Sequence, residues 1–254
     1  MRLASKCILA IVGVWFIVTQ AKAGSLDVPA PRLSPIYIFD PTSIAWNKDT
    51  GVSSVSLADR IKNSCQGKCA ATIFLGKELD TGLSYVDGMK PPFVPPWHYQ
   101  YGDSGIVGGA LSRTIFEIGN LYATEIEGGL AQRFGSLHET ETWIALYARW
   151  KYFPWNSYLI TTIAISTGLS YASAVTPYEA SEASDGKGQR LLHYFSPEIT
   201  FAMPSRPNLE FMIRFHHRSG GGSVYGNNLP LYGSIFHGAD GGMQYLTVGR
   251  REHF

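Results

Sequence analysis

One alternating stretch near the end of the chain constrains its fold more than any other feature. Over residues 209–215 the odd positions are all apolar, whereas the even positions include Glu210 and Arg214. A period of two places successive side chains on opposite faces, which is the pattern of a β-strand. The apolar face continues into His217 and then Ser219, so a potential base and a potential nucleophile lie beside aromatic and aliphatic residues.

The same alternation recurs along most of the chain and predicts eight strands. Their expected bounds are about 70–79, 104–118, 121–134, 140–153, 158–172, 191–203, 208–220 and 243–254. Each strand has one apolar face and one face with polar or charged residues, as at Glu125 and Arg133 in the third. Eight strands can close a barrel. We therefore expect an all-β fold, an eight-stranded antiparallel transmembrane β-barrel over residues 70–254 with an irregular N-terminal segment before it.

Alternation alone does not decide whether the apolar faces point into or out of the barrel. A secreted, soluble, lipocalin-like barrel would bury them, whereas an outer-membrane barrel turns them toward lipid and keeps a polar interior. Most of the expected strands are about 12 to 15 residues long, more than the roughly 9–11 residues of a tilted membrane-spanning strand. Aromatic residues gather at strand ends, as between Trp150 and Tyr158, which suits an interfacial girdle. These features favour the membrane.

The connections and the C-terminus point the same way. Short connections are expected at 119–120, 153–157 and 204–207, and long ones at 80–103, 173–190 and 221–242. The short 135–139 loop is the exception to this alternation. In outer-membrane barrels the short turns are periplasmic and the long loops extracellular. The chain ends on Phe254, with Gly249 five residues earlier, which resembles the terminal signature read by the barrel assembly machinery.

Residues 1–23 are predicted to be a secretory signal peptide. Arg2 and Lys6 precede an apolar run of about a dozen residues, and Ala21-Lys22-Ala23 is a small-x-small cleavage site. A membrane-spanning helix would need a longer run of roughly 20 residues. Cleavage would leave 18 Lys and Arg against 20 Asp and Glu, from 21 and 20 in the whole chain. That balance gives no basic field for nucleic acid, and we expect the bacterial outer membrane as the location.

Residues 24–69 are expected to form a periplasmic N-terminal segment. We expect it to be irregular, because prolines interrupt any regular element there. The segment ends in Cys65-Gln66-Gly67-Lys68-Cys69. In an exported protein this spacing is most simply a small disulfide loop, with two free thiols as the alternative. No His or third Cys lies nearby in the sequence, so a metal site is not expected.

The candidate chemistry lies in the His-x-Ser pair. A serine needs a base to become a nucleophile, and residues two apart on a strand share a face, so His217 can reach Ser219. A third group that holds the imidazole would complete a triad. The last strand places Gln244 near its outer end on the lipid-facing side, and Asp240 lies four residues earlier. Because Gln cannot stabilise a charged imidazole as a carboxylate does, Asp240 is the expected acid and Gln244 the alternative.

These residues also carry a resemblance. The segment Phe215-His216-His217-Arg218-Ser219-Gly220, with the Gly-rich loop and aromatic-ended strand after it, resembles the lipid A 3-O-deacylase family of Gram-negative outer membranes. The resemblance implies an eight-stranded barrel that removes an ester-linked acyl chain from lipid A, the lipid of lipopolysaccharide, with Ser219 as nucleophile and His217 as general base. No cofactor follows from this mechanism. Where the family usually has Asn after the Ser, this chain has Gly220, which leaves backbone N–H groups to stabilise an oxyanion.

Two other interpretations remain open. His216, His217 and Arg218 could bind lipopolysaccharide phosphates at the outer rim. The chain could also be a non-enzymatic outer-membrane barrel with a structural or adhesive role, whose binding surface is formed by loops 80–103 and 173–190.

The charged faces of the strands predict a buried ion-pair network that fills a narrow lumen. Its expected members are Glu125, Glu127, Glu198 and Glu210 with Arg133, Arg149 and Arg214.

Overall fold

The structure is a computed structural model that describes residues 32–33, 64–80, 96–183, 186–220, 235–236 and 242–254. The predicted signal peptide, most of the 24–69 segment and Asp240 lie outside the described residues. Within the described part of the chain, no helix is long and apolar enough to cross a membrane.

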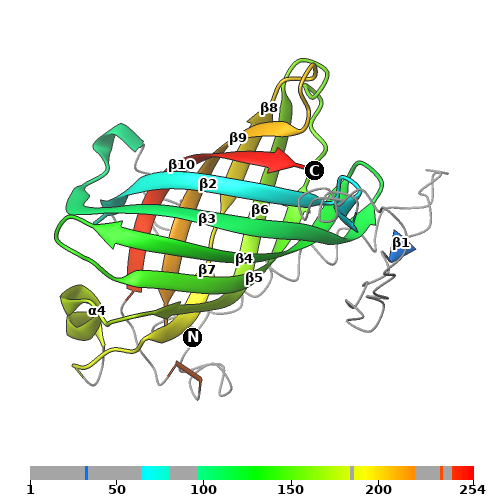
Figure 1. Cartoon of the computed structure of the whole chain (residues 1–254). Helices are drawn as coiled ribbons and strands as arrows, with labels where there is room; N and C mark the ends of the chain where they lie inside the picture. Colours follow the sequence, from blue (N-terminus) through cyan, green and yellow to red (C-terminus); the bar gives the residue numbers. More distant parts are fainter. Residues whose placement is uncertain (1–31, 34–63, 81–95, 184–185, 221–234, 237–241) are drawn as a thin grey trace, which may run out of the picture. The chain divides into compact units, whose positions relative to one another are not determined.

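Antiparallel strands close into a ring (Figure 1). In ring order they are β3 (Tyr101–Ile118), β2 (Cys69–Leu79), β10 (Gly242–His253), β9 (Leu209–Ser219), the broken strand β7 (Leu191–Phe195) and β8 (Glu198–Ala202), β6 (Ile160–Ala172), β5 (Thr140–Trp150) and β4 (Tyr122–Phe134). Pairing of β4 with β3 closes the barrel. A further two-residue strand, β1 (Arg32–Leu33), pairs with β3 near its end. The predicted eight-stranded antiparallel barrel is confirmed.

The strand formed by β7 and β8 differs from the prediction because it is interrupted at Ser196-Pro197. Proline has no N–H to donate to a ladder, which explains a break at this position. The register against β9 continues through the break, with Phe195 opposite His217 before it and Glu198 opposite Arg214 after it. The two segments therefore occupy one place in the ring, and the faces of the strand do not change across it.

The apolar faces of the strands point outward and the charged faces inward. Ile73, Leu130 and Ile144 are 66%, 55% and 55% exposed, whereas Glu141 and Arg214 are 0% exposed. A soluble barrel would bury the first group and expose the second. The soluble lipocalin-like alternative is therefore wrong, and the chain is a small outer-membrane β-barrel with a polar interior.

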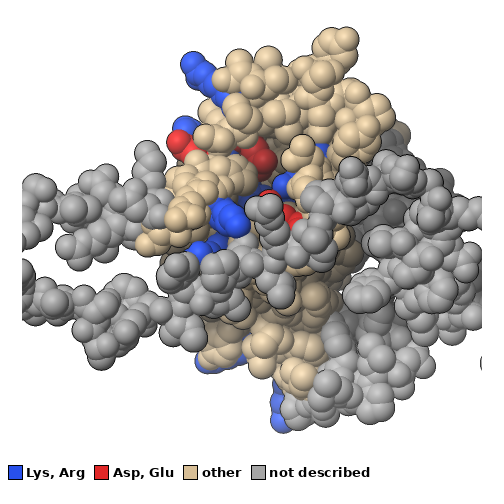
Figure 2. Space-filling model, turned by 90° about the vertical axis from the view of Figure 1, so that its right-hand side faces the viewer, with Lys and Arg blue, Asp and Glu red and all other residues tan. Residues whose placement is uncertain are grey.

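The two ends of the barrel have different connections. At the end that carries the C-terminus (Figure 1), short turns join the strands, and Trp150, Tyr152 and Trp155 are exposed as an aromatic girdle requires. Seen from this end (Figure 2), acidic and basic side chains gather within a surface of otherwise uncharged residues. The opposite end carries the longer connections, including α4 (Pro177–Glu182), together with the short 135–139 loop. The topology of outer-membrane barrels makes this second end the outer one.

Ion pairs fill the interior toward the periplasmic end. Glu198 is the centre of this group, because it contacts both Arg149 and Arg214 at 2.6 Å. Arg149 also binds Glu125 at 3.0 Å, and Arg214 binds Glu127 at 2.8 Å. The predicted network is therefore present, with Arg251 as an added member that lies 2.8 Å from Glu125 and 3.8 Å from Glu210.

One predicted member of that network lies elsewhere. Arg133 pairs with Glu141 at 2.8 Å, and Ser170 donates to the same carboxylate at 2.7 Å. Glu141 also contacts His216, whose ring in turn contacts the hydroxyl of Tyr194. This second, separate group fills the lumen nearer the outer end.

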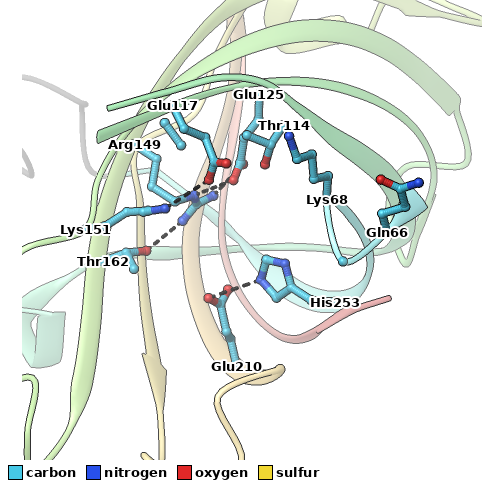
Figure 3. A pocket seen from close by; sticks show the side chains of 12 residues that line it. Gln66, Lys68, Thr114, Glu117, Glu125, Arg149, Lys151, Thr162, Glu210 and His253 are labelled. Atoms are coloured by element: carbon cyan, nitrogen blue, oxygen red, sulfur yellow. Dashed lines mark hydrogen bonds and ion pairs between the residues drawn. The ribbon is translucent and has the colours of Figure 1, made fainter. Parts of the chain in front are cut away.

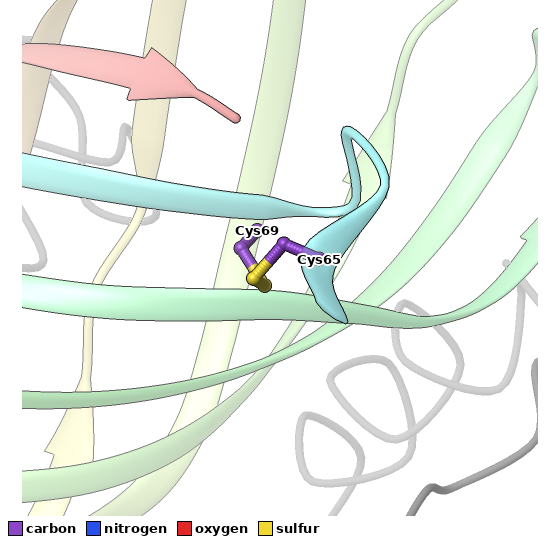
Figure 4. Close-up of a disulfide and its surroundings, with 2 residues drawn as sticks. All are labelled: Cys65 and Cys69. Carbon is purple, nitrogen blue, oxygen red and sulfur yellow. A yellow bond between two sulfur atoms is a disulfide. The ribbon is translucent and has the colours of Figure 1, made fainter. Parts of the chain in front are cut away.

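A disulfide joins Cys65 to Cys69, the first residue of β2 (Figure 4), as the sequence predicted. Between them, Lys68 N donates to Cys65 O at 2.8 Å. Gln66 and Gly67 have φ values of 48° and 76°. Positive φ at both central residues is the arrangement of a type I′ turn, which glycine adopts without steric cost.

Candidate active site

Strand β9 brings His217 and Ser219 together on the outward face at the outer end of the barrel. Nε2 of His217 lies 3.0 Å from Oγ of Ser219, a hydrogen-bond distance for a base and a nucleophile. Strand geometry produces this pair, because the residue between them, Arg218, points inward and is fully buried. The Phe215 ring stacks beside the His217 imidazole, with 6.0 Å between centroids.

The other nitrogen of His217 is where an acid would act. If Nε2 accepts the Ser219 proton, Nδ1 carries a hydrogen and needs an acceptor. Nδ1 is buried and has no hydrogen bond of standard geometry within the described residues, although Gln244 lies directly opposite on β10 with its side chain beside it. The Gln244 amide nitrogen donates to Leu79 O at 2.9 Å. Gln244 therefore lies where the sequence placed it, and the predicted acid Asp240 is outside the described residues.

A second histidine, which the sequence analysis did not single out, lies beside the pair. His193 is directly opposite Ser219 across the β7–β9 ladder. It lies on the outward face, because its neighbours Leu192 and Tyr194 are fully buried inside the barrel. Its Nε2 is 2.9 Å from Thr167 Oγ1 on the next strand, β6. The alternation Leu191-His193-Phe195 indicates the outward face, but the pairing with Ser219 depends on a register that local sequence does not contain.

Glycine occupies the opposite side of Ser219. Gly242 is its partner on β10, and a Cβ there would overlap the carbonyl oxygen of Arg218 and lie 2.7 Å from the Cβ of Ser219. The nucleophile therefore has a histidine on one neighbouring strand and no side chain on the other.

The phosphate-binding alternative is not supported for two of its three residues. His216 and Arg218 both point into the barrel and are fully buried. His216 contacts Glu141 at 3.1 Å, while Arg218 contacts Glu179 of α4 at 3.3 Å. Their charged or polar groups are turned away from lipid, so His217 is the one member of that trio on the outer wall.

A cavity of about 330 Å³ lies inside the barrel at the periplasmic end (Figure 3). Its walls include Lys151 paired with Glu117 at 3.1 Å, and His253 paired with Glu210 at 3.3 Å. A polar cavity of this size accommodates water. These four side chains already contact one another in pairs, so the cavity is the periplasmic end of the lumen network. Among the described residues, no group of three or more His, Cys, Asp or Glu is arranged to hold a metal ion.

Comparison with known proteins concerns the fold. No protein-family model matches the chain, and no curated protein matches it in sequence. Similar solved structures include the outer membrane enzyme PagL, at 10% identity and a TM-score of 0.44 over 72% of this chain and 98% of that chain. Neisserial surface protein A has 12% identity and a TM-score of 0.40, over 74% and 97%. Ail, the attachment invasion locus protein of Yersinia pestis, has 12% identity and a TM-score of 0.33, over 74% and 99%. None of these similarities assigns a residue or an activity to this chain.

Proposed function

We propose that this barrel is an outer-membrane esterase that removes an ester-linked acyl chain from lipid A, with Ser219 as nucleophile and His217 as general base. The observation that carries the proposal is the 3.0 Å contact between His217 Nε2 and Ser219 Oγ on the outer wall. Two polar side chains on a lipid-facing wall cost desolvation free energy unless they have a partner or a task. Membership of the lipid A 3-O-deacylase family is part of the same proposal.

The position of the pair suits a lipid substrate. His217 and Ser219 lie at the outer end of β9, where we expect the outer leaflet of the membrane. Toward the membrane centre the same face continues with Ile213 and Phe211, the latter 51% exposed. An acyl chain can therefore stay in the bilayer against this apolar wall while its ester group reaches Ser219.

The proposed reaction is acyl transfer to Ser219 followed by hydrolysis. His217 Nε2 takes the proton from Ser219 Oγ as the oxygen bonds to the ester carbonyl carbon, and the carbonyl π electrons become an oxyanion. Collapse of this intermediate breaks the bond to the lipid A oxygen, which receives the proton from His217. Water then attacks the acyl-serine with the same proton transfers, and a free fatty acid and Ser219 result.

An acid at Nδ1 of His217 would complete this site. It would stabilise the imidazolium that forms when the Ser219 proton is taken. Asp240 is our proposal for that acid, and Gln244 is the alternative because it lies opposite His217. Gln244 would hold the orientation of the ring without contributing a negative charge.

The proposal is tested with purified wild-type protein and Ser219→Ala in detergent, each incubated with purified lipopolysaccharide. Release of fatty acid is measured by mass spectrometry. We expect release by the wild type and none above background by Ser219→Ala, with both proteins folded as judged by heat-modifiable migration on gels. Equal release by both proteins, or none by either, would favour the non-enzymatic barrel.

A further inference from the structure

We infer that Arg218 is a positioning residue for the proposed active site. Its side chain anchors the end of β9 from inside the barrel and so holds Ser219 beside His217. This role rests on the proposed esterase function and adds a residue that the proposed reaction does not itself use. Arg218 lies between the two site residues, but its side chain is fully buried in the lumen. It therefore acts through its neighbours on the strand and not on the ester.

The part of β9 that carries the site is the end of the strand. Ser219 is its last residue. The ladder with β7 consists of three residue pairs, which join residues 193–195 to residues 217–219, and it stops at the break at Ser196-Pro197. Strand ends open more readily than strand centres. Opening here would change the 3.0 Å contact between His217 Nε2 and Ser219 Oγ.

The guanidinium of Arg218 extends the connection between β9 and β7 beyond these three pairs. Its Nη2 donates to Arg190 O at 2.7 Å and to Gln189 O at 3.3 Å, two carbonyls that directly precede β7. Arg190 O also accepts from Ala172 N at 3.0 Å, which ties it to the end of β6. Hydrogen bonds from a charged donor are stronger than neutral ones. Arg218 therefore fastens the end of β9 to the start of the neighbouring strand.

A second anchor comes from α4. Nε of Arg218 lies 3.3 Å from Oε1 of Glu179, and both side chains are buried. The other carboxylate oxygen of Glu179 accepts from Thr176 N at 3.0 Å, while Thr176 Oγ1 accepts from Glu179 N at 3.0 Å. This capping box holds the carboxylate in place at the start of the helix. The outer connection that contains α4 is thus joined to the strand that carries the site.

A buried arginine can also serve stability alone, and the barrel contains a matched example. Arg251 on β10 is likewise buried and lies 2.8 Å from Glu125. Its ion pairs are at the periplasmic end, away from His217 and Ser219. Replacement of either arginine by Met removes one buried guanidinium from an ion pair in the lumen. An effect on the site that is confined to Arg218 therefore separates positioning from a general loss of stability.

The test compares wild type, Arg218→Met, Arg218→Lys, Arg251→Met and Ser219→Ala as full chains in detergent, with p-nitrophenyl decanoate as the ester. Misplacement of a reacting group by about 1 Å can lower the rate about 10²-fold. We expect a loss of that order in kcat for Arg218→Met with KM nearly unchanged. Arg218→Lys should recover part of it, because its ammonium can donate to Arg190 O, and Arg251→Met should keep kcat near that of wild type. Equal kcat values for Arg218→Met and Arg251→Met would overturn the inference.

Amide hydrogen exchange tests the anchor without relying on activity. Exchange at residues 217–219 should be faster in Arg218→Met than in wild type and unchanged in Arg251→Met, whereas unchanged exchange in both would overturn the anchor. If wild type hydrolyses the ester no faster than Ser219→Ala, the esterase function fails together with the positioning role, and exchange still decides whether Arg218 holds β9.

A second variant covers the case in which Arg218→Met does not fold. Glu179→Gln keeps an acceptor for the capping box but removes the charge that faces Arg218. A lower kcat together with faster exchange at residues 217–219 supports the inference. Wild-type kcat and wild-type exchange in Glu179→Gln overturn it.

Discussion

Nε2 of His217 lies 3.0 Å from Oγ of Ser219, and both side chains leave β9 on the face that meets lipid. His193 on β7 and Gly242 on β10 lie opposite Ser219, so residues of three neighbouring strands surround the pair. The barrel gives these side chains a rigid support, since β9 is hydrogen-bonded on both sides.

The first prediction concerns the acid. In ester hydrolysis by the purified protein, Asp240→Asn should lower kcat, by up to about 10⁴-fold if its charge stabilises the imidazolium. Gln244→Glu places a carboxylate opposite His217 and should restore part of the lost rate in the double variant. Gln244→Ala serves as the control for loss of the amide. Wild-type kcat in Asp240→Asn would remove Asp240 from the site.

The second prediction concerns the space beside the nucleophile. Gly242→Ala introduces a Cβ that overlaps Arg218 O and crowds Ser219, so the last ladder pair must shift. A displacement of about 1 Å at a reacting group can lower the rate about 10²-fold. The control is Gly128→Ala, where the added Cβ would meet only the Trp143 carbonyl oxygen, at 3.9 Å. Equal kcat values for the two variants would contradict this account of Gly242.

The third prediction concerns the ion pairs of the lumen. Glu198→Leu removes the carboxylate that contacts both Arg149 and Arg214 at 2.6 Å. Loss of one partner leaves buried charge uncompensated and should lower the free energy of unfolding by about 3–5 kcal/mol. Glu252→Gln breaks an exposed pair with Arg250 and should cost about 0–1 kcal/mol. Urea unfolding from lipid vesicles measures the free energy of unfolding of each variant. Equally small losses for Glu198→Leu and Glu252→Gln would argue against a tightly coupled network.

The fourth prediction concerns the outer wall. Ile144 is 55% exposed near the middle of β5, so Ile144→Arg places a charge in hydrocarbon. Near the membrane midplane this costs about 2–4 kcal/mol. Ser136→Arg, in the 135–139 loop, should change stability by no more than about 0.5 kcal/mol. The measurement is equilibrium folding into vesicles, and an Arg tolerated equally at both positions would mean that Ile144 faces water.

Much of this fold follows from local sequence. A period of two indicates each strand and its apolar face, and it also places His217 and Ser219 side by side, because their separation is two residues. The direction of the apolar faces was inferred from strand length and aromatic ends, and the exposure of Ile73 and Leu130 agrees with it. The break at Pro197 was not predicted, because one uninterrupted strand was expected over 191–203, but the unchanged register across the break left the alternation intact.

What the sequence could not supply depends on how neighbouring strands pair. Arg133 was expected with the other lumen charges, but the pairing of β4 with β5 brings Glu141 next to it. In the same way His193 reaches Ser219 through the register of β7 on β9. A register depends on the turns and on the patterns of both strands, so the pattern of one strand alone does not determine it.

The most direct test of the central claim is mass spectrometry of lipid A from cells that express the wild type or Ser219→Ala, with both proteins confirmed as folded in the outer membrane. The account predicts that lipid A loses one ester-linked acyl chain only in cells with the wild type. Identical lipid A spectra from the two strains would contradict it and leave a barrel without this enzymatic function.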